Sequence, residues 1–159
     1  RLAQINVHHL LDESHSVLTQ TDTFSPHPPP PDNFPFSRLD HPVIGKVVKD
    51  PLLQKKFSPQ NYGVVFKTEK SASVHAPAKG KVVFKGPFLS QGDILILDHG
   101  HDVHTVYMGM DKIKVNMGQD LYAGAKLGSM ASYGKNPPLL YLELRQNGKP
   151  IDPFPYLKE

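Results

Sequence analysis

The chain has 159 residues, of which 38% are hydrophobic, and this is enough for one folded domain with an appended segment. It contains no cysteine, which excludes disulfide bridges and thiolate metal sites. The formal charge of +3 suits an anionic partner such as a cell-wall polymer or a membrane surface, and equally suits a mildly basic protein without one. The chain has no dense run of Lys and Arg, so we expect no nucleic-acid partner.

The first 24 residues are predicted to form a short helical segment. Leu2, Ile5, Leu11 and Leu18 give an imperfect apolar stripe, and no proline or glycine interrupts it. The segment is either the end of a longer coiled coil or a helix that packs on the domain. It lacks the basic, apolar and small-residue pattern of a signal peptide. Because the chain begins at Arg1, we expect an export signal to have been removed.

A proline-rich linker is predicted over residues 25–37. Four consecutive prolines, Pro28 to Pro31, fix an extended polyproline II conformation. A semi-rigid spacer between the helical segment and the following domain is the favoured interpretation. The PxxP pattern also occurs in SH3 ligands, but this motif alone is weak evidence.

From residue 38 to residue 159 the pattern becomes mainly β. Short apolar stretches alternate with Gly, Pro, Asn and Asp, which is typical of an antiparallel sandwich or barrel and not of a βαβ fold. The predicted strands lie at 42–48, 62–66, 74–77, 81–84, 93–98, 104–108, 112–115, 126–130 and 139–145.

The last of these strands carries the most informative pattern. Its alternation places Leu140, Leu142 and Leu144 on one side and Leu139, Tyr141, Glu143 and Arg145 on the other. We therefore expect one side to belong to the core and the other to be available for function.

Several segments, taken in order, closely resemble the LytM domain, the fold of the M23 zinc peptidases that cut peptidoglycan crosslinks. Residues 74–82 resemble its V-x-A-P-x-x-G-x-V turn, and residues 94–100 resemble its apolar strand ending in D-H-G. Residues 115–128 and 148–157 resemble its later glycine turns and its closing G-x-P-x-D-P motif. The resemblance covers residues 38–159 and implies an antiparallel, sandwich-like β domain.

The same resemblance implies that the hydrolytic residues are lost. M23 enzymes hold zinc with His and Asp side chains and leave one position open for water. The family's ligands fall on Asn61, Val65 and Tyr141, and its further active-site histidines fall on Gly109 and Leu139. None of these is a good zinc ligand at neutral pH. We therefore expect no zinc, no other cofactor and no enzymatic activity.

A LytM domain without zinc keeps its groove. Degenerate members of the EnvC-like group use the groove to bind and activate the N-acetylmuramoyl-L-alanine amidases that split daughter-cell walls. The resemblance implies a non-catalytic amidase activator in the periplasm of a Gram-negative bacterium, linked to a membrane division complex through an N-terminal coiled coil. Residues 1–24 would be the end of that coiled coil or a lid over the groove. The groove residues would be Tyr62, Val65, Gln91, Ile94, Tyr141 and Arg145.

Three other functions compete with this prediction. A peptidoglycan-binding module would use the same groove with Arg145 and Lys135. A zinc-dependent M23 endopeptidase would require other ligands than those assigned above. A lipoyl-like carrier is suggested by Asp111-Lys112, but that fold places its lysine before the A-P-x-x-G segment and not after it.

The histidines near residue 100 offer a second possible metal site. His99, His101 and His104 lie close to Asp98 and Asp102 in the sequence. The resemblance implies a structural role for His99 in the D-H-G turn, and no fixed geometry is implied for His101 and His104 in their loop. A solvated hairpin is therefore favoured over a metal site.

Overall fold

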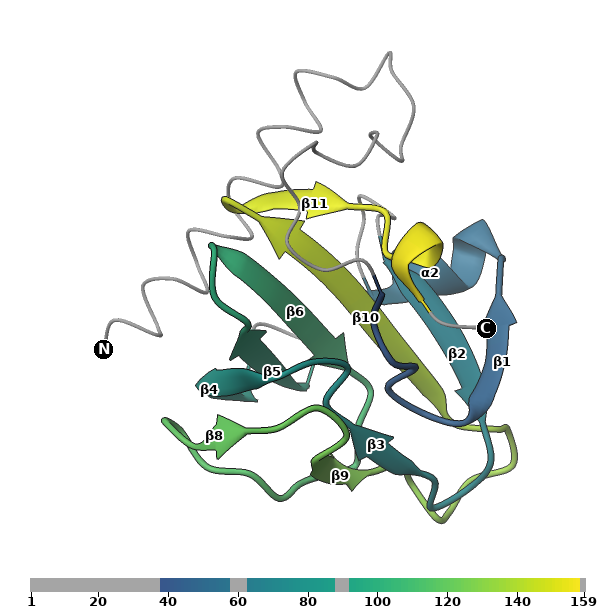
Figure 1. The fold of residues 1–159 in the computed structure, drawn as a ribbon. Helices are drawn as coiled ribbons and strands as arrows, with labels where there is room; N and C mark the ends of the chain where they lie inside the picture. Colours follow the sequence, from purple (N-terminus) through teal and green to yellow (C-terminus); the bar gives the residue numbers. More distant parts are fainter. Residues whose placement is uncertain (1–37, 58–62, 88–91, 158–159) are drawn as a thin grey trace.

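The computed structural model describes residues 38–57, 63–87 and 92–157, which form two antiparallel sheets, one α-helix and one 3-10 helix (Figure 1). The predicted mainly β fold is confirmed. The larger sheet has, in spatial order, β1 (Gly45–Val48), β2 (Val64–Thr68), β10 (Leu139–Gln146), β6 (Val103–Met108), β5 (Asp93–Asp98), β4 (Gly80–Pro87) and β8 (Asp120–Leu121), with β11 (Lys149–Ile151) beside β10. The smaller sheet has the order β3 (Ser73–His75), β9 (Lys126–Ser129) and β7 (Lys112–Ile113).

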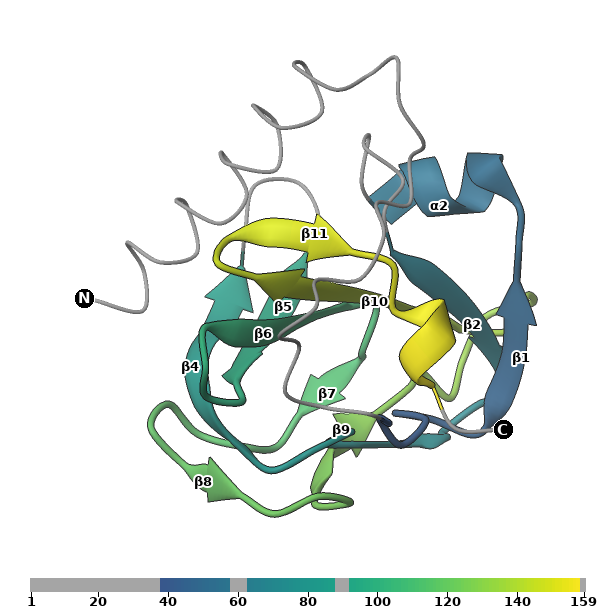
Figure 2. The same cartoon turned by 45° about the horizontal axis from the view of Figure 1, so that its top comes forward.

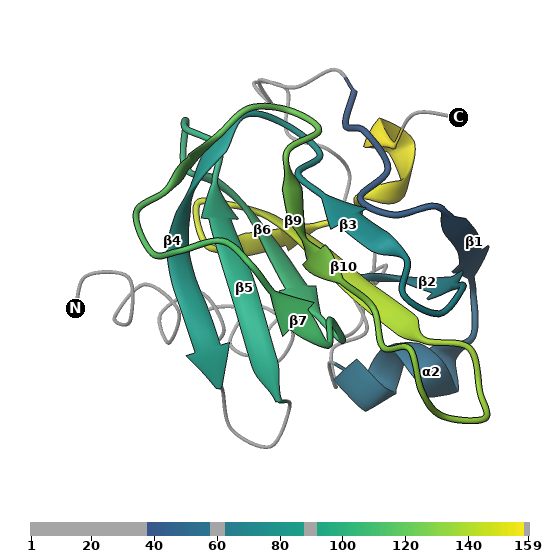
Figure 3. The ribbon, with the colours of Figure 1, turned by 90° about the horizontal axis from the view of Figure 1, so that it is seen from below.

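The main hydrophobic core lies between the two sheets, which Figure 3 shows as separate layers. Leu140, Leu142 and Leu144 of β10 belong to it, together with Val74 of β3 and Leu127 of β9. Burial of these side chains removes apolar surface from water and holds the small sheet against the large one. The core side of β10 is therefore as predicted.

A second apolar cluster covers the opposite face of the larger sheet. Because side chains alternate along a strand, the residues between those of the main core point to this face. The cluster contains Val65, Ile94, Ile96, Val106, Met108 and Tyr141. The larger sheet is thus buried on both faces where its central strands lie.

One helix was not predicted from the sequence. Helix α2 (Pro51–Phe57) follows β1 and lies on the face of the second cluster, on the other side of β2 and β10 from the small sheet (Figure 2). Asp50 Oδ1 accepts a hydrogen bond from the Leu52 amide at 3.0 Å, as at a helix N-cap, and Pro51 occupies the first helical position. The Phe57 ring is stacked on Tyr141 with the ring centroids 5.3 Å apart. Local capping and one aromatic contact thus fix a helix of only seven residues.

The predicted strands differ from the observed ones mainly at their ends. The first is shortened to β1 because Val43 makes only an isolated bridge to Val74. Strands β8 and β11 and the 3-10 helix η1 (Phe154–Tyr156) were not predicted. The predicted helical segment at 1–24 and the linker at 25–37 lie outside the described residues. Among the described helices, none has the length and apolar character that a membrane crossing requires.

Candidate functional site

Three of the predicted groove residues lie in one row across the larger sheet. Tyr141 of β10 pairs with Val65 of β2 on one side and with Met108 of β6 on the other, and Met108 pairs with Ile94 of β5. All four side chains belong to the second apolar cluster. The topology therefore brings together positions that are up to 76 residues apart in the sequence (141 − 65).

Gly109 and Leu139, the two positions assigned to the further active-site histidines, also lie close together, just beyond the Tyr141–Met108 pair. A Cβ atom on Gly109 would lie only 2.2 Å from the carbonyl oxygen of Leu139. The φ angle of Gly109 is +105°, which side chains other than glycine rarely adopt. The backbone at this point has a shape in which a histidine would not fit.

The side chains found at these positions do not suit a zinc ion. Val65, Leu139 and Gly109 offer no donor atom from a side chain. Tyr141 has a hydroxyl group, but its oxygen is 2.5 Å from Glu143 Oε1, to which it donates, and it accepts a hydrogen bond from the Gly63 amide at 3.1 Å. No group of three or more His, Cys, Asp or Glu residues that could hold a metal is found in the described ranges. Asn61 lies outside them.

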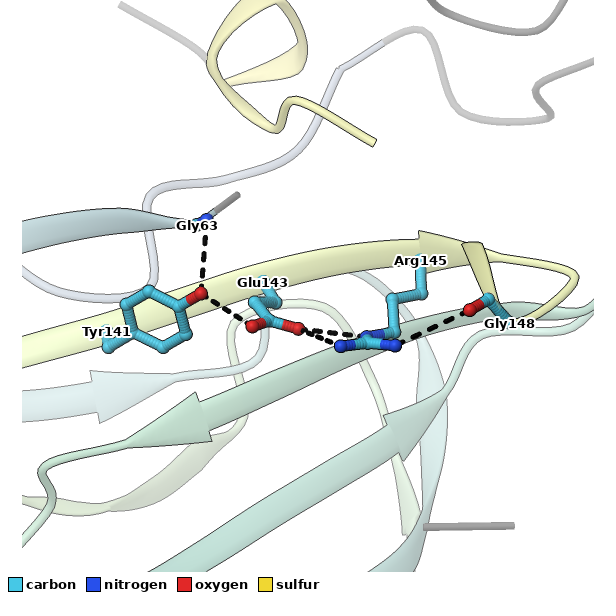
Figure 4. Close-up of polar contacts among 5 residues, drawn as sticks. All are labelled: Gly63, Tyr141, Glu143, Arg145 and Gly148. Atoms are coloured by element: carbon cyan, nitrogen blue, oxygen red, sulfur yellow. Dashed lines mark hydrogen bonds and ion pairs between the residues drawn. The ribbon is translucent and has the colours of Figure 1, made fainter. Parts of the chain in front are cut away.

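A buried polar network continues from Tyr141 along the same face of β10 (Figure 4). The guanidinium of Arg145 donates from Nε and from Nη2 to Glu143 Oε2, at 2.9 and 2.6 Å. Its Nη1 also donates to the Gly148 carbonyl at 3.4 Å. Glu143 and Arg145 are each 1% exposed and Tyr141 is 0% exposed. This side of β10 was predicted to be available for function, but in this structure its polar side chains are buried and bonded to one another.

Arg145 pairs across the sheet with His104 of β6, and His104 in turn pairs with Asp98 of β5. His104 Nε2 lies 3.8 Å from Asp98 Oδ2. Burial lowers the pKa of His104, while Asp98 and Asp102 act to raise it and Arg145 acts to lower it. Burial is the largest of these effects, so His104 favours the neutral form.

The one histidine of this turn that is buried is His99. Its Nδ1 lies 2.8 Å from the Lys79 carbonyl, which can only accept, and its Nε2 lies 2.7 Å from Thr105 Oγ1. Thr105 Oγ1 is in turn hydrogen-bonded to the Tyr107 hydroxyl at 3.1 Å. Burial lowers the pKa of His99. His99 thus belongs to a buried polar chain, in keeping with the structural role that the resemblance implies for it. His101 is exposed as predicted, whereas His104 is half-buried.

An open cavity of about 540 Å³ lies beside the row of replaced ligands. It is bounded by helix α2 on one side and by the segment leading into β10 on the other. Its described lining residues are Leu53, Lys56, Phe57, Lys67, Gly109, Asn136, Pro137, Pro138 and Leu139. None of them is fully buried, so among the described residues this cavity forms an accessible surface next to Tyr141.

The predicted site residues thus divide into three groups. Val65, Ile94 and Tyr141 lie together but are buried, and Arg145 lies buried at the far end of β10. Tyr62 and Gln91 are outside the described residues.

The cavity residues Lys56, Phe57 and Lys67 were not predicted from the sequence, because they fall outside the family motifs. The Asp50-Pro51 pair was the available signal for the helix that carries two of them.

Residues 59–153 match the model of peptidase family M23. The chain is 32% identical over 129 residues to the murein hydrolase activator NlpD of Escherichia coli K12. The match covers 79% of this chain and 32% of that protein. It is 35% identical over 98 residues to the outer membrane antigenic lipoprotein B of Haemophilus influenzae, covering 61% of this chain and 24% of the relative. The chain therefore spans about a quarter to a third of the length of these relatives.

Solved structures show the same fold. A peptidase M23 structure from Pseudomonas aeruginosa is similar with a TM-score of 0.63 and 26% identity, covering 89% of this chain and 59% of that one. The catalytic domain of lysostaphin from Staphylococcus simulans is similar with a TM-score of 0.52 and 27% identity, covering 60% of this chain and 77% of that one. The family match decides against a lipoyl-like carrier, and Lys112 lies on β7 and not at a hairpin tip. By sequence and by fold, this chain is a LytM-type member of peptidase family M23.

Proposed function

We propose that this chain is a non-catalytic activator of N-acetylmuramoyl-L-alanine amidases in cell-wall splitting at division. It contributes no catalytic atom. Contact with the surface around Tyr62, Val65, Gln91, Ile94, Tyr141 and Arg145 favours the open conformation of an amidase whose own regulatory segment blocks its active site. A shift of this kind requires that the chain bind the open state more tightly than the closed one.

The chemistry of the replaced ligand positions carries this proposal. An M23 peptidase needs an open zinc coordination position, whereas Val65 and Leu139 are apolar and the Tyr141 hydroxyl is bonded to Glu143. The named relatives point in the same direction, since NlpD is described as a murein hydrolase activator and not as a hydrolase. The narrower EnvC-like grouping remains a prediction.

The proposed location is the periplasmic cell envelope of a Gram-negative bacterium. One relative is named as an outer membrane lipoprotein and another as lipoprotein NlpD. A basic domain is also suited to work beside an anionic wall polymer. A membrane division complex would recruit the chain through residues that precede the described domain.

The first experiment is dye release from labelled sacculi. The arms contain a cognate amidase alone, this chain alone, and both together. Release only when both proteins are present supports the proposed activator. Release by the chain alone, abolished by EDTA, would show instead that it is a zinc endopeptidase.

A peptidoglycan-binding module remains the second candidate. The basic composition favours it, but Arg145, one of the residues expected to hold the polymer, is paired with Glu143 and 1% exposed. A pull-down with purified sacculi tests this candidate. Retention on sacculi with no effect on amidase release would favour it over activation.

A further inference from the structure

The cavity beside Tyr141 combines positive charge with apolar walls. Lys56 of α2 and Lys67 of β2 line it, and both side chains are exposed. No Asp or Glu is among the described lining residues, and neither lysine forms an ion pair with another described residue. The cavity therefore presents two cations to solvent.

Strand pairing concentrates this charge further. Lys46 of β1 lies directly opposite Lys67, and Leu139 of β10 lies opposite Lys67 on its other side. The three residues form the row next to that of Val65 and Tyr141 and share its face of the sheet. Like charges directly across two strands repel each other. An anion bound beside Lys67 in the cavity would relieve this repulsion.

The walls of the cavity are apolar and rigid. Phe57 is held by its stacking on Tyr141, and Pro137 and Pro138 have fixed φ angles. Such a wall buries an apolar side chain without losing conformational freedom of its own. The volume of about 540 Å³ is in the range of sites that hold a small ligand or a few residues of a peptide.

We propose that this cavity binds an acidic segment of the partner protein, with one carboxylate between Lys56 and Lys67 and one apolar side chain against Phe57 and Leu139. This inference rests on the proposed function, because it names the part of the amidase that the chain recognises. The buried Tyr141, which stacks on Phe57, then supports the site from beneath and does not touch the partner.

The apolar walls favour a protein segment over peptidoglycan. Peptidoglycan peptides also carry carboxylates, yet their side chains include alanine and few larger apolar groups. They would leave Phe57 and Leu139 without a partner of matching size. An acidic protein segment with a Leu, Ile or Phe beside its carboxylate fills both parts of the cavity.

The test compares two charge-reversed double variants of equal net charge. K56E/K67E alters the cavity, and K112E/K126E alters two exposed lysines on the small sheet. Binding of each variant to the full-length cognate amidase is measured by calorimetry at low and high salt, and sacculi binding is measured in parallel. Thermal unfolding of both variants confirms that they are folded.

We expect K56E/K67E to weaken amidase binding at least about tenfold and to remove most of its salt dependence, while K112E/K126E changes binding less than about threefold. Equal amidase binding by K56E/K67E and the wild type would overturn this inference and leave the activator proposal intact. Loss of sacculi binding alone by K56E/K67E would assign the cavity to the wall polymer and also overturn it. No binding and no stimulation of the amidase by the wild type would overturn both.

Discussion

At the scale of single residues, the most consequential feature is the buried pair of Glu143 and Arg145. Two charges removed from water are stable only when each is paired and hydrogen-bonded. Arg145 meets this requirement with two hydrogen bonds to Glu143 and one to Gly148, and Glu143 also accepts from Tyr141. The pair thus ties the central strand to the turn before β11.

Removing one member of the pair should be more damaging than replacing both. Glu143→Ala leaves a buried guanidinium without its carboxylate, and we expect a loss of about 3–5 kcal/mol in the free energy of unfolding. Urea unfolding of the purified chain measures this loss. The double variant E143L/R145M, which removes both charges, should lose less than Glu143→Ala. Equal or greater loss in the double variant would argue against this account.

His99 should make stability depend on pH. Its pKa in the folded chain lies below the ordinary value of 6.5 because burial disfavours the charged form. As the pH falls below about 6.5, the unfolded chain takes up a proton that the folded chain does not, so stability decreases until the pH reaches the folded pKa. The melting temperature of wild type should therefore fall more between about pH 7.5 and pH 5 than that of His99→Asn. Parallel curves for the two proteins would contradict this expectation.

At the scale of elements, the sequence predicted the strands better than the helix. The apolar runs of β5 and β10 are strong strand signals because both faces of these strands are buried. Helix α2 is too short to show a helical period, and its position depends on Phe57 reaching Tyr141, which is 84 residues away (141 − 57). A contact of that range leaves no local trace in the sequence.

The same reason limits what could be predicted of the site. Family motifs placed Val65, Leu139 and Tyr141 at the replaced ligand positions, and the structure does bring them together. Motifs could not show that Tyr141 and Arg145 are buried, since this depends on what covers and pairs with them. They also could not show Lys67 beside Lys46, because the register of two strands is a tertiary property.

The end of β6 gives a prediction about backbone shape. Gly109→Ala would place a Cβ atom 2.2 Å from the Leu139 carbonyl at a φ of +105°, and we expect a loss of about 1–3 kcal/mol in stability. Chemical unfolding of the purified variant measures this loss of stability. Gly118, which has φ of +81° and no atom within 4 Å of its built Cβ, is the matched control for strain without a clash. A smaller loss for Gly109→Ala than for Gly118→Ala would contradict the role of the Leu139 contact.

At the scale of the whole molecule, the proposed loss of the zinc ligands predicts a flat response of stability to metal. A domain that binds zinc only when folded gains stability in proportion to the logarithm of zinc concentration. We expect neither zinc at about 0.1 mM nor EDTA to move the melting temperature by more than about 1 °C. The lysostaphin catalytic domain is a natural control of the same fold. A clear zinc-dependent rise for this chain would contradict the proposed loss of ligands.

The position of β10 has a consequence for how the chain becomes a domain. This strand comes near the C-terminus, yet it lies between β2 and β6 at the middle of the larger sheet. Until it is in place, β1–β2 and the β4–β5–β6 group have no strand in common and are separate pieces. Pairings this distant in sequence form slowly. A chain that emerges from its N-terminus can therefore complete the larger sheet only after residues 139–146 have joined β2 to β6.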